Sequence, residues 1–116
     1  MRFLALIAVL ALILSPMAAM AAAGIPSYEQ LTVANTALGI TAATYAPAPD
    51  GTPRTQCTLV LETAQIRWRA DALAPTSSVG TPFDPGGVLV IPSSAFKSIQ
   101  FIRTTSTSGV LNITCE

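Results

Sequence analysis

The sequence predicts an all-β protein, either an antiparallel β-sandwich or a small jelly-roll-like barrel of about six to seven short strands. Three observations predict it. The chain has 116 residues, which is enough for one small domain. After an apolar leader, short runs alternate between apolar and polar residues with a period of two, and no helical period is sustained. Clusters of Pro, Gly, Ser and Thr separate these runs at intervals of about eight to twelve residues, as in sandwiches and barrels.

The leader resembles a secretory signal peptide in the order of its parts. Arg2 is followed by an apolar run from Phe3 to Leu14, and small residues end at Ala21. A helix of that run is about 18 Å long, too short for a hydrocarbon layer of roughly 30 Å. We therefore expect residues 1–21 to be a signal peptide, 22–30 a linker and 31–116 the β-sandwich domain. The alternative is an apolar arm that is retained.

The first half of the expected domain contains two places where the alternation changes phase. One lies around Asn35-Thr36 within 31–45, where we expect a bulge or a bend. The other lies at 63–65, which separates odd apolar positions from even ones and predicts two strands or one bulged strand. Residues 46–53 contain three prolines and Asp-Gly, which predicts a loop.

The second half begins with residues 70–87, which are rich in Pro and Gly and predict a long loop. The apolar run 88–91 predicts a strand that is buried on both faces or lies at an edge. Residues 99–103 and 111–115 alternate again, and the polar segment between them predicts that they pair as an antiparallel hairpin.

The two cysteines, Cys57 and Cys115, share the apolar phase of their strands, so both side chains are expected to point inward. In an exported chain, an even cysteine count favours a disulfide between them. The sequence leaves a second reading open, in which both are free buried thiols.

Composition excludes several kinds of function. Six Lys and Arg residues balance six Asp and Glu residues, so there is no basic footprint for a nucleic acid. The chain has no His, which excludes imidazole catalysis and histidine metal ligands. Lys97 is near Ser94 and Ser98, but nothing around them resembles an oxyanion hole. We expect no enzyme, no catalytic residue, no cofactor and no metal. The carboxylates are scattered: Glu29, Asp50, Glu62, Asp71, Asp84 and Glu116.

Three arginines are the candidate contact surface. Arg67 and Arg69 share one strand face, and we expect Arg103 to meet them across the sheet. Such a stripe can bind a partner's carboxylates through bidentate hydrogen bonds. The alternative is that these arginines pair with Glu62 and Asp71 within the domain.

Several spaced segments resemble small proteins encoded among phage and prophage structural genes. They are 61–69 (LETAQIRWR), 75–80 (PTSSVG), 99–103 (IQFIR) and 106–114 (STSGVLNIT), and the resemblance covers about 33–116. It implies an all-β virion accessory protein, such as a capsid decoration or cement subunit, with no catalytic residues to transfer. The signal-like leader departs from that pattern, because capsids assemble in the cytoplasm.

From these observations we expect a non-enzymatic structural or assembly protein, a phage or prophage virion accessory subunit of the decoration type. Its partner is a protein, either another copy of the chain or a virion surface. A membrane is contacted only transiently, through the signal segment. The alternative is a secreted or periplasmic β-sandwich binding module. The location is periplasmic or extracellular if the signal is cleaved, and otherwise the virion.

Overall fold

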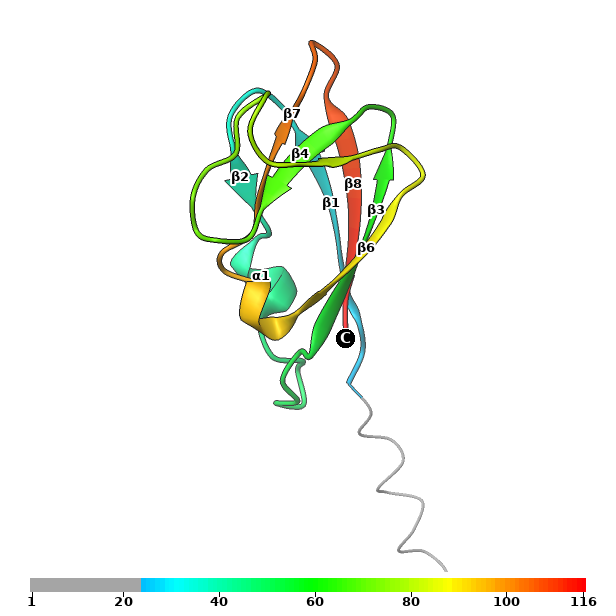
Figure 1. The fold of residues 1–116 in the computed structure, drawn as a ribbon. Helices are drawn as coiled ribbons and strands as arrows, with labels where there is room; N and C mark the ends of the chain where they lie inside the picture. The colour runs from blue at the N-terminus through cyan, green and yellow to red at the C-terminus, as the bar shows by residue number, and fades with distance from the viewer. Residues whose placement is uncertain (1–23) are drawn as a thin grey trace, which may run out of the picture.

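The computed structural model describes residues 24–116, which form two four-stranded antiparallel sheets packed face to face (Figure 1). The predicted sandwich is confirmed, with eight strands where six to seven were expected. The expected signal peptide lies outside the described residues. Among residues 24–116, no helix is long and apolar enough to cross a membrane. The elements are β1 (Ser27–Val33), β2 (Leu38–Gly39), α1 (Ala42–Tyr45), β3 (Gln56–Glu62), β4 (Ile66–Arg69), β5 (Thr81–Phe83), β6 (Val88–Pro92), η1 (Ser93–Ala95), β7 (Gln100–Arg103) and β8 (Gly109–Cys115).

The strand order is that of a jelly roll. The first sheet, called sheet A, has the order β1-β8-β3-β6, and the second, sheet B, has the order β2-β7-β4-β5. The strand pairs β1 with β8, β2 with β7, β3 with β6 and β4 with β5 are all antiparallel. The chain therefore behaves as one long hairpin that is folded over into two sheets.

The chain changes sheets where the alternation changes phase. Asn35-Thr36 lies between β1 in sheet A and β2 in sheet B, and residues 63–65 lie between β3 in sheet A and β4 in sheet B. Thr63 turns the chain with a positive φ of 76°. Its hydroxyl donates a hydrogen bond to the carbonyl of Ser108 at 3.0 Å, which ties this turn to the loop before β8. Of the two readings of 55–69, the structure shows two strands.

Two expectations about element placement were wrong, and one loop has structure of its own. The segments 99–103 and 111–115 do not pair, because β7 lies in sheet B and β8 in sheet A, and an alternating pattern identifies faces but not neighbours. The loop 70–87, which is long enough to have structure of its own, contains the short strand β5. The strand β1 begins at Ser27, inside the segment 22–30 that was expected to be a linker, and it pairs with β8 along its whole length.

A short helix also interrupts the segment that was expected to continue as strand. α1 covers only four residues, and the 3-10 turn η1 follows β6. These two elements meet through Tyr45 and Phe96, whose ring centroids are 5.7 Å apart. In Figure 1 they lie together at the end of the sandwich where β8 finishes.

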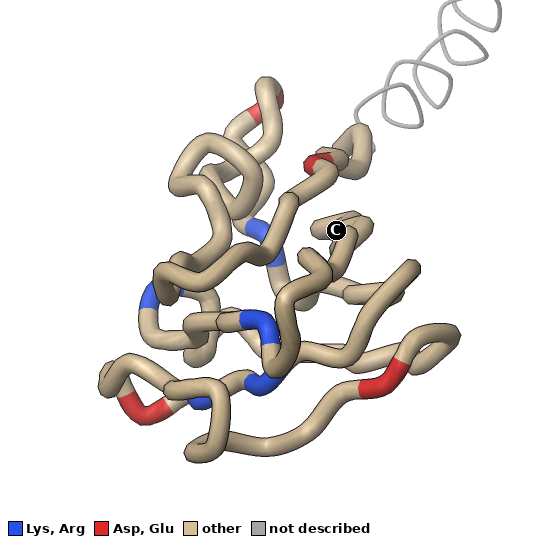
Figure 2. The backbone as a smooth tube through the Cα atoms, turned by 90° about the horizontal axis from the view of Figure 1, so that it is seen from above, with Lys and Arg blue, Asp and Glu red and all other residues tan. Residues whose placement is uncertain are grey.

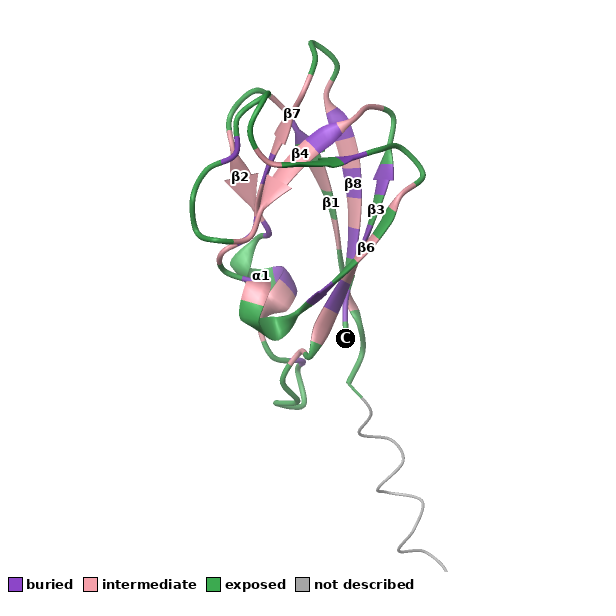
Figure 3. Cartoon of the chain, viewed as in Figure 1, coloured by how far each residue is buried: buried purple, intermediate pink, exposed green. Residues whose placement is uncertain are grey.

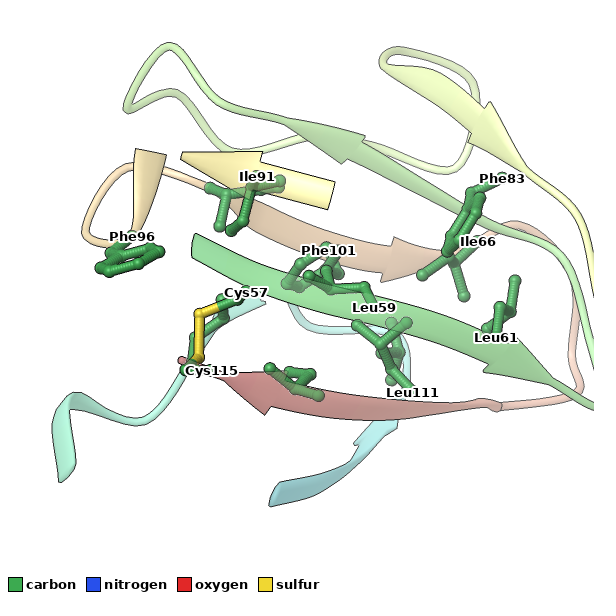
Figure 4. Packing of buried hydrophobic residues seen from close by; sticks show 14 residues of the cluster. Cys57, Leu59, Leu61, Ile66, Phe83, Ile91, Phe96, Phe101, Leu111 and Cys115 are labelled. Carbon is green, nitrogen blue, oxygen red and sulfur yellow. A yellow bond between two sulfur atoms is a disulfide. The ribbon is translucent and has the colours of Figure 1, made fainter. Parts of the chain in front are cut away.

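The core lies between the two sheets and follows the predicted phase. Buried positions alternate with more exposed ones along β3 and β8 (Figure 3). Sheet A contributes Leu59, Leu61 and Leu111, and sheet B contributes Ile66 and Phe101, all at most 1% exposed (Figure 4). Burial of these apolar side chains is the main source of stability for a domain of this size.

Candidate interaction surface

The disulfide joins Cys57 on β3 to Cys115 on β8. The two residues lie directly opposite each other in sheet A, with 4.0 Å between their Cα atoms, and both are fully buried (Figure 4). The predicted bridge is therefore confirmed, and the alternative of two free thiols is wrong. A buried intramolecular disulfide is consistent with an oxidising compartment outside the cytoplasm.

The three arginines do not form the expected stripe. Arg67 and Arg69 lie on the same face of β4, but Arg103 on β7 lies opposite Ile66, in the other phase of the sheet. Arg67 is opposite Ile102 instead. The expectation that Arg103 meets the other two across the sheet was wrong, because the register places its side chain on the opposite face. A role of these arginines in binding a partner stays a prediction.

Arg67 supports the loop that precedes β5. Its Nε donates a hydrogen bond to the carbonyl of Ser77 at 3.1 Å, and its Nη1 donates one to the carbonyl of Gly80 at 2.7 Å. These bonds hold the loop over the outer face of sheet B. The fork geometry of a guanidinium suits two carbonyl acceptors, so Arg67 has a structural use.

Arg69 forms a bidentate pair with Asp71, which was the alternative considered for it. Its Nε donates to Oδ1 of Asp71 at 3.0 Å, and its Nη2 contacts Oδ2. The Arg69 hydrogen bonds lower the pKa of the Asp71 carboxyl, and the same pair raises the pKa of Arg69. Glu62 takes no part in this pair, because β3 belongs to the other sheet.

Arg103 lines a polar recess of about 460 Å³ at the end of β7. Its Nη1 donates to the Ser108 hydroxyl at 3.3 Å. The recess is also lined by Asn35, Thr76 and Thr104, and none of its lining residues is acidic. In Figure 2, uncharged stretches of the described chain separate the charged residues, which therefore form no continuous run of one sign.

The outer face of sheet A carries three exposed valines. Val60, Val88 and Val90 are 37%, 62% and 54% exposed, and we call these three residues the valine patch. Val60 on β3 lies directly opposite Val88 on β6, so their side chains are neighbours on one face. On the same sheet, Asn112 Oδ1 on β8 accepts a hydrogen bond from the Tyr28 hydroxyl on β1 at 2.6 Å.

The outer edge of β6 is open. Leu61 donates its N–H to the carbonyl of Gly87 at 3.2 Å and accepts from the N–H of Gly86 at 2.8 Å. In an antiparallel ladder the bonded residues alternate, so the backbone groups of Val88 and Val90 point away from β3. Within residues 24–116, no strand pairs with that side of β6. The corresponding edge strand of sheet B, β5, carries Pro82, which blunts it.

Sequence reasoning missed this combination of patch and edge. The run 88–91 had two readings, a strand buried on both faces or a strand at an edge, and the structure shows the second. The signal that favoured it was Pro92 at the end of the run, because a proline fits an edge strand better than a central one.

Asp50 and the segment around Lys97 take part in local hydrogen bonds. Among residues 24–116, no three His, Cys, Asp or Glu side chains gather closely enough to hold a metal ion. Asp50 accepts the N–H of Thr52 at 3.0 Å, which lowers its pKa and marks a turn. Ser98 donates to the carbonyl of Ala95, two residues before Lys97.

A scan against protein-family models found no match, and searches of the curated proteins and of the solved structures found no significantly similar protein. The phage-structural resemblance of the sequence therefore stays a proposal, while the β-sandwich and its disulfide are observed in the structure.

Proposed function

We propose that this chain is a non-enzymatic assembly subunit, a phage or prophage virion accessory protein of the decoration type, and that it associates with further copies of itself. The observation that carries the proposal is the open edge of β6 beside the valine patch. Natural sheets usually protect such an edge with charge, proline or a covering segment, and β6 keeps five residues with only Pro92 at its end.

A second copy fits this edge better than an unrelated partner. Antiparallel pairing of β6 with β6 around a twofold axis joins identical backbone patterns, which is the commonest symmetry of soluble oligomers. β6 has no charged residue, so two copies meet without like-charge repulsion. The exposed side chains of Val88 and Val90 then contact their equivalents, and pairing buries apolar area on both sides.

Two observations favour a second candidate function. The buried Cys57–Cys115 disulfide and the signal-like leader together suit a secreted or periplasmic binding module. In the first candidate the domain is part of a particle, and in the second it is free in the periplasm or medium.

The two candidates differ in where the protein is found. Particles released by the host that carries the gene can be purified on a density gradient and compared with the particle-free periplasm and medium. The assembly proposal predicts that this chain sediments with particles at a constant copy number. Its absence from the particles, with the processed chain free in the other fractions, contradicts the virion role and supports the binding module.

A further inference from the structure

A second recess lies between α1 and η1, at the end of the sandwich where β8 finishes. Its volume is about 360 Å³, at the lower end of the range of about 300–1,000 Å³ for small-molecule sites. Its walls come from two segments far apart in sequence, 42–47 and 93–97. From the sequence, 42–47 was not a candidate site, and Lys97 and Ser94 were considered only as a catalytic pair.

The walls of this recess are mostly apolar. Ala42, Tyr45 and Ala46 lie on one side, and Phe96 lies on the other. Phe96 is only 5% exposed and belongs to the core, so this side of the recess is held in place by packing. Tyr45 packs against Phe96 with a tilt of 30° between the rings, which forms an aromatic corner. Such a corner favours a flat apolar group.

The polar part of the recess carries one charge. Lys97 is the single charged residue that lines it, and Ser94, three residues earlier in the chain, also lines it. Among residues 24–116, the structure shows no ion pair for Lys97. An ammonium group at the rim of an apolar recess attracts an anion.

We propose that this recess binds a small organic carboxylate whose body is apolar and preferably aromatic. The body lies against Tyr45 and Phe96, and the carboxylate accepts a hydrogen bond from the Lys97 ammonium. The Ser94 hydroxyl is placed to donate a second bond. The proposal uses neither Val88 nor Val90, so it does not rest on the assembly function.

The probe is 3-phenylpropionate, and its neutral counterpart is 3-phenylpropanol. The protein is produced from the full-length chain with export, so that the disulfide closes, and is titrated while its amide resonances are followed by two-dimensional NMR. The proposal predicts saturable shifts at Ala42, Ala46, Ser94 and Lys97 with the acid, and binding of the alcohol about three- to fivefold weaker. No saturable shift up to the solubility limit, or shifts centred elsewhere, would overturn it.

Two pairs of variants make the test specific. Lys97→Gln is expected to weaken the acid about three- to fivefold and to leave the alcohol unchanged, whereas Arg69→Gln changes neither. Ala42→Leu fills the recess and is expected to abolish binding, whereas the neighbouring Ala43→Leu, which is exposed and does not line it, keeps binding. Equal acid affinity in Lys97→Gln and in the unaltered protein contradicts the proposal, whatever the fate of the alanine variants.

Discussion

The carboxylate of Glu29 on β1 accepts a hydrogen bond from the Thr44 hydroxyl on α1 at 2.6 Å. The same carboxylate accepts from the Thr41 hydroxyl at 2.5 Å and from the Thr41 backbone N–H at 3.2 Å. A helix of four residues has no stability of its own. Glu29, on a strand twelve and more residues away, therefore helps to fix the position of α1, together with the Ser27 hydroxyl that donates to the Thr44 carbonyl.

Glu29→Gln is expected to lower the free energy of unfolding by about 1 kcal/mol, because charge-assisted hydrogen bonds to α1 become neutral or are lost. Urea unfolding at neutral pH measures this. The matched control is Glu62→Gln, since Glu62 is exposed on the outer face of sheet A and forms no hydrogen bond of this kind in the described part. Equal midpoints for the two variants would show that the carboxylate of Glu29 does not stabilise α1.

Removing the disulfide is expected to be the most destabilising of these changes. The bridge closes a loop with a sequence separation of 58 residues. The chain-entropy model assigns such a closure about 4 kcal/mol. The double variant Cys57→Ala, Cys115→Ala should lose an amount of that order in urea unfolding. Adding dithiothreitol should destabilise the unaltered protein and leave the double variant unchanged. An equal response of both proteins to the reductant would contradict a structural bridge.

The Arg69–Asp71 pair predicts a small dependence of stability on pH. The hydrogen bonds from Arg69 lower the pKa of Asp71 below its ordinary value of 3.8, so the folded state holds this proton less tightly than the unfolded state. The contribution is present above pH 3.8 and is lost as the pH falls through the lowered folded pKa. Asp71→Asn should therefore be less stable than the unaltered protein at neutral pH, with a gap that narrows at about pH 2. Urea unfolding of both proteins at the two pH values measures this difference in stability. If the difference is the same at both pH values, the Arg69–Asp71 pair is not its cause.

A larger residue at Gly109 is expected to lower the stability of the fold. A Cβ at this position would lie 2.6 Å from Cγ2 of Ile66 and 2.9 Å from the carbonyl of Ala64. Gly109→Ala should cost about 1–3 kcal/mol, because β8 and the β3–β4 turn must separate. At Gly51 a Cβ meets nothing within 4 Å, although φ is 86°. Gly51→Ala should cost about 1 kcal/mol, from the left-handed backbone alone. Thermal unfolding of both variants measures the two losses of stability. Gly109→Ala is expected to lose more than Gly51→Ala, and a smaller loss for Gly109→Ala would show that the packing around Gly109 is loose.

The alternating pattern predicted faces well and neighbours poorly. Cys57 and Cys115 were expected to point inward and do so, because the side-chain period of a strand is two regardless of which strand lies beside it. The alternating pattern did not predict which strand pairs with β7, because a strand with one face toward the core has the same pattern in either sheet. Arg103 is a different case: β7 does lie beside β4, but Arg103 shares the phase of Phe101 and lies opposite Ile66, so its side chain is on the other face from Arg67.

Features that depend on contacts distant in sequence were the hardest to predict. The helix at Ala42–Tyr45 is too short to show a period, and its anchor is Glu29. The recess beside Lys97 is formed by α1 and η1 together, which are far apart in sequence. No local sequence motif therefore predicts it.

Sedimentation velocity over a range of concentrations tests the assembly claim most directly, with protein produced from the full-length chain and exported. If β6 pairs with β6 of a second copy, the unaltered protein sediments as a dimer or larger species and Val88→Lys sediments as a monomer. Val79→Lys places the same change at an exposed valine outside sheet A and should behave as the unaltered protein does. A monomer at every concentration for the unaltered protein, or association undiminished by Val88→Lys, would contradict assembly through β6.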